Sequence, residues 1–180
     1  NKITDFKTEL NEDEKDLISI SMWASEPIPF DKMEIALHKA YTKVNDKDMR
    51  SEFKMIHEYP LSEKPPMMTH IFESKDKTII AAKGAPEALI AISKLSDSEK
   101  NHIQNAIKEL TNEGYRILAV AESNFEGKNF PKTQQEFHFD FKGLVAFYDP
   151  PKKNINVVLE HFYKAGISVK IITGDNAETT

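Results

Sequence analysis

The sequence lacks cysteine, long apolar runs and any basic stripe, and each absence excludes a class of protein. Without cysteine among its 180 residues, the chain forms no disulfide, and its composition suits a reducing compartment. No run approaches the roughly 18 consecutive apolar residues of a membrane span, so we expect no direct membrane insertion of this segment. Lysine and arginine are scattered among more numerous acidic residues, with a net charge of −5, which argues against nucleic acid as a partner.

Two phosphate-binding loops are also missing. The chain holds neither the G-x-x-x-x-G-K-[ST] loop nor the G-x-G-x-x-G fingerprint of dinucleotide-binding folds. The histidines are dispersed without the spacing of metal ligands, so we expect surface or packing roles for them and no metal site. They are His38, His57, His70, His102, His138 and His161.

The composition that remains is that of a folded domain. Hydrophobic residues make up 39% of the chain and charged residues 29%, so it can bury a core, and its length suits one domain or one and a half. Hydrophobic periodicity and turn residues define the expected elements. Helices are expected at 11–25, 31–44, from 86 onward, 96–114 and 154–165, and strands at 53–59, 68–73, 78–83, 116–121 and 137–148.

The helix at 31–44 is the best specified. Its apolar residues recur at steps of three and four, which places them on one buried stripe. Asp31 is expected to cap its start. Glu34 stands three residues later, where it either completes a capping box or accepts a hydrogen bond from the exocyclic amine of an adenine.

Two cations stand at the ends of predicted strands. Lys83 precedes Gly84, so a flexible positive charge lies beside backbone without a side chain, which suits an anionic ligand such as a nucleotide phosphate. Arg116 opens a strand and can form paired hydrogen bonds with a phosphate. Each also fits an ordinary role, Lys83 as a solvated residue before a turn and Arg116 in a surface ion pair.

The chain changes character near residues 146–150. A helix at 154–165 and a strand at 168–172 form half of a doubly wound unit, in which ligands bind beyond the carboxyl ends of strands. A hydroxyl, a flexible backbone and a carboxylate follow that strand and suit phosphate- or magnesium-linked chemistry. They belong to Thr173, Gly174 and Asp175.

Five motifs, in order, resemble those of the P-type cation-transporting ATPases. They are D-K-M-E-I-A-L at 31–37, K-G-A-P-E at 83–87, G-Y-R-I-L-A-V-A at 114–121, D-P-P-K at 149–152 and T-G-D-N-A-E-T at 173–179. Two depart slightly from the family's pattern, since Lys32 stands where proline is common and Lys152 where arginine is. The likeness spans roughly 30–180 and favours the calcium- or sodium-pump-like branch.

The resemblance implies an α+β fold, with an antiparallel sheet flanked by helices and a C-terminal α/β strip of a haloacid-dehalogenase-like phosphorylation domain. It divides the chain into a phosphorylation-domain edge at 1–7, a nucleotide-binding domain at 8–146 and a partial phosphorylation domain at 147–180. Residues 1–3 resemble those just after the family's D-K-T-G-T-L-T. The aspartate that becomes phosphorylated is therefore expected outside the chain, with no catalytic residue within it.

The resemblance also implies a role for each candidate residue. Glu34 would contact adenine, Lys83 and Gly84 would line the adenine pocket, and Arg116 would reach the phosphates. The remaining assignments are a phosphoryl-transfer site at Thr173, Gly174 and Asp175 and an interdomain hinge at Asp149.

Two departures from the family concern the nucleotide pocket. Leu61 stands where many relatives carry an aromatic residue, so base stacking is expected to be weak or supplied by Tyr59. Pro65 and Pro66 replace a frequent Arg-Lys pair, and we expect both in a loop because proline does not donate to a sheet ladder. We therefore expect modest nucleotide affinity.

For the intact protein, the resemblance implies an ATP-driven cation pump of the cell membrane, with this segment on its cytoplasmic side. ATP and Mg²⁺ are the implied cofactors, and the remaining phosphorylation, actuator and membrane domains are the implied partners. The segment alone is expected to bind ATP without turnover. Two other interpretations stay open: a stand-alone nucleotide-binding or sensing module, and a haloacid-dehalogenase-type phosphatase with a large cap.

Overall fold

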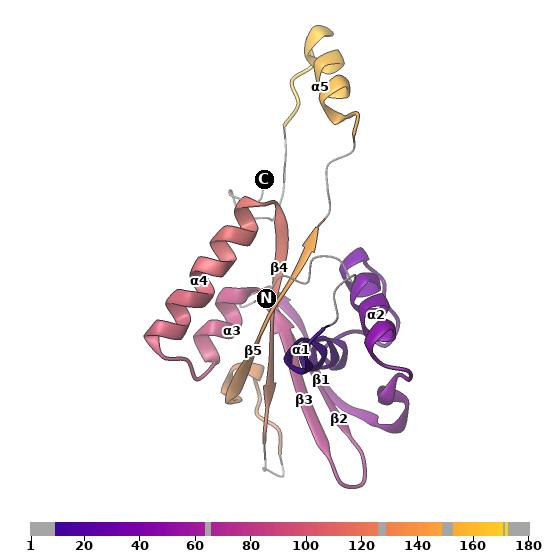
Figure 1. The fold of residues 1–180 in the computed structure, drawn as a ribbon, viewed down its shortest axis with the longest axis vertical. Helices are drawn as coiled ribbons and strands as arrows, with labels where there is room; N and C mark the ends of the chain where they lie inside the picture. Colours follow the sequence, from indigo (N-terminus) through magenta and orange to yellow (C-terminus); the bar gives the residue numbers. More distant parts are fainter. Residues whose placement is uncertain (1–9, 64–65, 126–128, 149–152, 171, 173–180) are drawn as a thin grey trace.

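A computed structural model describes residues 10–63, 66–125, 129–148, 153–170 and 172 (Figure 1). Within them, five strands form one antiparallel sheet whose spatial order follows the chain. The strands are β1 (Lys54–Glu63), β2 (Pro66–Glu73), β3 (Thr78–Gly84), β4 (Tyr115–Ser123) and β5 (Phe139–Tyr148). The predicted antiparallel sheet flanked by helices is confirmed.

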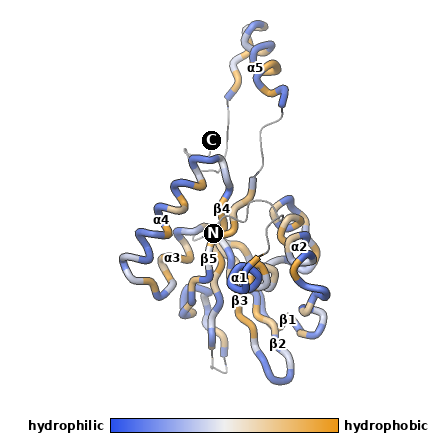
Figure 2. The backbone as a smooth tube through the Cα atoms, viewed as in Figure 1, coloured by the Kyte–Doolittle hydropathy of each residue, from blue (hydrophilic) through white to orange (hydrophobic). Residues whose placement is uncertain are grey.

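Helices cover both faces of this sheet (Figure 1). The first pair, α1 (Glu12–Trp23) and α2 (Lys32–Val44), packs on one face, and α3 (Pro86–Ile92) packs on the other with α4 (Asp97–Asn112) beside it. Figure 2 shows hydrophobic residues recurring along the otherwise hydrophilic α4, which is the periodicity of a helix with one buried side. Two short 3₁₀ turns, Met49–Glu52 and Gln134–Glu136, complete this body.

The helices begin where their capping residues predict. Asp31 accepts hydrogen bonds from the backbone N–H groups of Met33 and Glu34 at 2.7 and 2.8 Å, which satisfies two donors at the start of α2. Ser96 and Glu99 form a capping box at the start of α4, where the helix at 96–114 was expected to begin. These contacts fix the entry of the chain into both helices.

A separate hydrophobic cluster lies on each face of the sheet. Beneath α3, the buried residues are Tyr59, Met67, Ile71, Ile80, Ala82, Ala88, Leu89, Ala119, Ala121, Phe137 and Phe139. Beneath α1 and α2, they are Ile20, Trp23, Ala24, Leu37, Phe72, Ile79, Ala81, Val120 and Val145. Successive residues of β3 alternate between the clusters, as the two-residue period of a strand requires.

The prediction for Pro66 was wrong. Pro66 is the first residue of β2, where it is paired with Glu63, and its carbonyl accepts a hydrogen bond from the N–H of Ala85 at 2.8 Å. Proline is tolerated at the first position of a strand because its missing N–H is not needed there. Pro65 lies outside the described residues.

The C-terminal part confirms a helix but not the strand after it. Helix α5 (Ile155–Lys164) is followed by Gly166, whose φ of 73° suits a residue without a Cβ. Residues 167–170 and 172 belong to no strand, so the haloacid-dehalogenase-like strip is not established by the part of the chain that is described. None of the residues of α5 is buried.

Candidate functional site

A buried ion pair joins two of the predicted site residues. Glu34 Oε1, from the first turn of α2, pairs with Nζ of Lys83, near the end of β3, and each side chain is only 6% exposed. Lys83 also donates to Oγ of Ser25 at 2.9 Å, and that hydroxyl donates to the carbonyl of Ser21 at 2.7 Å. This series of hydrogen bonds links α2, β3 and α1, and it holds the ammonium group of Lys83 in one place.

Burial decides the electrostatics of Lys83. Removal from water lowers the pKa of Lys83, and the hydrogen bond and charge of Glu34 oppose this shift. A buried ion pair gains little net stability, because desolvation offsets the attraction, whereas a buried charge without its partner is costly. The two residues are thus strongly dependent on each other.

The position of Glu34 separates the two roles considered for it. Its side chain does not close a capping box on Asp31 but turns inward to Lys83. Its second carboxylate oxygen, Oε2, is buried and has no hydrogen-bond partner within the described residues. An unpaired acceptor in such a place costs about 1–3 kcal/mol, and a ligand that donates a hydrogen bond removes that cost.

Arg116 lies beside the same turn of α2, in a groove of about 560 Å³. The groove is lined by Asp31, Lys32, Met33, Ala36, Arg116, Ala146, Phe147 and Tyr148. Its floor comes from β4 and β5, where Arg116 is paired with Phe147. Glu34 and Lys83 do not line it, although Glu34 directly follows Met33. The structure therefore places the buried pair and the arginine next to the same turn, but not in one cavity.

Gly84 has a packing role. A Cβ at this position would stand 2.4 Å from the carbonyl oxygen of Pro66 and 2.5 Å from Cα of Met67. No side chain fits there unless β2 moves. Gly84 therefore permits the close approach of β2 and β3. This packing role is independent of any contact with a ligand.

The two positions considered for contact with the base differ in burial. Leu61, near the end of β1, is 67% exposed. Tyr59 is buried in the cluster beneath α3, on the opposite face from Lys83, and its hydroxyl donates to the carbonyl of Pro131 at 2.6 Å. The expectation that Tyr59 replaces the missing aromatic is wrong, because its pairing with Thr69 places it on the other face.

Four of the predicted positions lie outside the described residues. They are the hinge residue Asp149 and the phosphoryl-transfer residues Thr173, Gly174 and Asp175. Their roles stay predictions.

Sequence reasoning missed the polar residues that support the buried pair. Arg50, at the 3₁₀ turn before β1, is 8% exposed and donates to the carbonyls of Met22, Ser25 and Glu26 at 3.1–3.3 Å. Its guanidinium also binds the carboxylate of Asp48. Arg50 thus holds the end of α1 against the sheet, and with it the hydroxyl that accepts from Lys83. A lone arginine between two predicted elements gives no signal of this kind in the sequence.

Residues 30–154 match the family model described as P-type ATPase, cytoplasmic domain N. The chain is 29% identical over 143 residues to a calcium-transporting ATPase of Bacillus subtilis, covering 73% of this chain. It is 30% identical over 159 residues to the sodium/potassium exporting P-type ATPase cta3 of Schizosaccharomyces pombe, and 26% identical over 161 residues to calcium-transporting ATPase 1 of Saccharomyces cerevisiae, each covering 81% of this chain.

These relatives are much longer than the chain. The matched regions cover 16%, 15% and 17% of their respective lengths. Among the described residues of this chain, no helix has the length and apolar character needed to cross a membrane.

Proposed function

The chain belongs to the P-type cation ATPases, whose cytoplasmic domain N it matches, and from this premise we propose that it binds ATP on the sheet face covered by α1 and α2. Buried charge on this face supports the proposal: the ion pair of Glu34 and Lys83 lies beneath the turn of α2 that borders the Arg116 groove. The family match favours this function over a stand-alone sensing module or a phosphatase.

The unpaired Oε2 of Glu34 is the observation that carries the proposal. The exocyclic amine of adenine is a donor, and it supplies the hydrogen bond that this oxygen lacks. Lys83 holds the other carboxylate oxygen, so Glu34 is already oriented when the base arrives. Met33 lines the groove and directly precedes Glu34, so a base seated there would lie against the turn of α2 that carries Glu34.

The groove itself suits the rest of the nucleotide. Its volume of about 560 Å³ lies within the range of small-molecule sites, which is about 300–1,000 Å³. Met33, Ala146 and Phe147 supply apolar surface, and Arg116 and Lys32 supply positive charge for phosphate oxygens. Leu61, which is 67% exposed near the end of β1, offers apolar surface without a ring that stacks on a base.

In the intact protein, this domain would present the γ-phosphate to an aspartate outside the chain. Mg²⁺ would accompany the triphosphate and neutralise charge during in-line transfer. Thr173, Gly174 and Asp175 are proposed to belong to that transfer site, with Asp149 at the hinge. The domain contributes binding and positioning, which are the main sources of rate in phosphoryl transfer.

At the level of the whole protein, we expect ATP-driven cation transport. The calcium- and sodium/potassium-transporting names of the relatives support this expectation. The segment would then be a cytoplasmic domain of an integral membrane protein, with the remaining phosphorylation, actuator and membrane domains as its partners. The chain alone is expected to bind ATP and not to hydrolyse it, and a phosphate-release assay checks this.

Calorimetric titration with ATP and GTP tests the adenine contact. Guanine has a carbonyl oxygen where adenine has its amine. That oxygen cannot donate a hydrogen bond to Glu34, so GTP should bind more weakly than ATP. Glu34→Gln keeps an acceptor for Lys83 and places a donor where Oε2 stood. We expect ATP affinity to fall about tenfold and the preference over GTP to narrow or reverse.

The matched control is Glu109→Gln on the exposed side of α4, which should leave both affinities unchanged. Saturating ATP should also shift the amide NMR signals of Lys83, Gly84 and Arg116. Unchanged spectra at millimolar ATP, or equal discrimination by wild type and Glu34→Gln, would contradict the proposal.

A further inference from the structure

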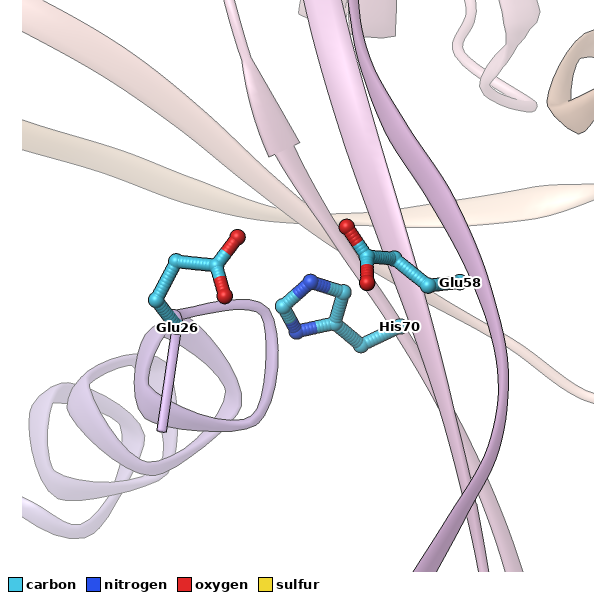
Figure 3. A group of neighbouring side chains, drawn as sticks. All are labelled: Glu26, Glu58 and His70. Carbon is cyan, nitrogen blue, oxygen red and sulfur yellow. The ribbon is translucent and has the colours of Figure 1, made fainter. Parts of the chain in front are cut away.

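A second cluster of ionisable side chains lies on the same sheet face. Glu26 follows α1, Glu58 lies in β1, and His70 lies in β2 directly across from Glu58. One ligand atom from each residue lies within 4.8 Å of the other two. Figure 3 shows the imidazole ring of His70 between the two carboxylates.

Lys83 is close enough for its charge to act on Glu26 and His70, but its ammonium group pairs with Glu34. His70 has an exposed fraction of 0%; the backbone of Trp23 lies near its ring, but neither ring nitrogen makes a hydrogen bond of good geometry within the described residues. Two carboxylates directed at one buried imidazole repel each other, and within the described part of the chain no ion pair joins either to a basic group. Buried polar atoms are normally satisfied, so these nitrogens point to a missing ligand.

We propose that Glu26, Glu58 and His70 form a binding site for a divalent transition-metal ion, with Zn²⁺ the best match. One imidazole and two carboxylates are the donor types that zinc accepts, and water fills the fourth position. Mg²⁺ and Ca²⁺ prefer oxygen ligands alone and fit this set less well. Burial lowers the pKa of His70, and the charges of Glu26 and Glu58 oppose this shift.

The geometry needs only a small adjustment. Zinc bonds of about 2.0–2.2 Å place neighbouring tetrahedral ligand atoms about 3.4 Å apart, so ligand atoms that lie within 4.8 Å of one another must close by up to about 1.4 Å. Glu58 is exposed and Glu26 half-buried, which leaves both free to rotate and gives the ion a path from solvent. The backbone of Glu26 is already held, because its carbonyl lies 3.0 Å from Nε2 of His38 and 3.3 Å from Nη1 of Arg50.

Competition between the 180-residue chain and a chromophoric zinc chelator tests the site. The experiment omits nucleotide, because a triphosphate itself binds metal ions. Wild type should take one Zn²⁺ per chain, and Mg²⁺ in excess should not displace it. His70→Ala should weaken binding by more than about 100-fold, because losing even an outer-shell partner costs about 10–100-fold.

Glu58→Gln is the decisive variant, because its exposed position lets the protein fold when His70→Ala does not. It should also weaken zinc binding, whereas His138→Ala, an exposed histidine outside the cluster, should bind like wild type. Zinc should raise the Tm of wild type and of His138→Ala but not that of Glu58→Gln. No zinc uptake by wild type, or equal uptake by folded Glu58→Gln, overturns the proposal and leaves His70 packed between two carboxylates.

Discussion

The two faces of the sheet differ in what they bury. Beneath α3 the core is apolar and aromatic, and Thr69 and Gln134 bond to each other at 2.8 Å. Beneath α1 and α2 the structure buries Glu34, Lys83 and His70. Charge in an interior is costly and does not hold a fold together efficiently. Its concentration on one face indicates that this face has a task other than stability.

The largest expected effect comes from breaking the buried pair. Lys83→Ala leaves Glu34 buried without its cation, which should lower the free energy of unfolding by about 3–5 kcal/mol. Urea denaturation measures the loss. Replacing both residues, as Glu34→Leu with Lys83→Met, should recover much of it, because no charge is then buried.

A half-exposed ion pair provides the control. Lys142 pairs with Glu122 across β4 and β5, and their side chains are 27% and 31% exposed. Lys142→Ala should cost about 0–1 kcal/mol. Equal losses at Lys83 and Lys142 would show that burial is not the source of the difference between the faces.

Leu89→Ala tests the apolar face. Leu89, in α3, is fully buried, and its truncation should cost about 2–5 kcal/mol through lost transfer energy and a cavity. Denaturation gives this value, and calorimetry of the folded variant should show unchanged ATP affinity. A loss of affinity as large as that of Glu34→Gln would remove the functional distinction between the faces.

Leu61→Phe should increase nucleotide affinity. An aromatic residue stacked on a base is worth about 1–3 kcal/mol, so a phenylalanine here should tighten ATP binding by about tenfold or more. Because Leu61 is 67% exposed, the stability should change by no more than about 0.5 kcal/mol. The variant Ile35→Phe, at an exposed position of α2 outside the groove lining, should leave the affinity unchanged.

Arg116 tests the phosphate end of the proposed site. Arg116→Ala removes the proposed phosphate ligand from the groove and should weaken ATP binding by about tenfold, or about 1.4 kcal/mol. The affinity for AMP, which has a single phosphate, should fall less than the affinity for ATP. Identical losses for ATP and AMP would place the arginine away from the outer phosphates and would confine phosphate binding to other residues.

The sequence alone predicted the elements whose signals lie in neighbouring residues. Periodicity located α2, and Ser96 with Glu99 located the start of α4. The direction of Glu34 was also available in principle, since it stands three residues before buried Leu37 on the apolar stripe. The capping-box interpretation ignored that stripe.

What could not be predicted depends on register and on distant segments. The face occupied by Tyr59 follows from its pairing with Thr69, and that pairing is fixed by the irregular β1 rather than by any short motif. Glu26, Glu58 and His70 come from three separate elements, so no spacing rule for metal ligands applies. Only the assembled sheet brings them together.

The strand order also has a consequence for folding kinetics. Every pair of neighbouring strands is consecutive in the chain, so most of the sheet can form hairpin by hairpin at a low entropic cost of loop closure. The exception is the step from β3 to β4, which must close over α3 and α4. Joining these two central strands is therefore expected to limit the rate at which the domain assembles.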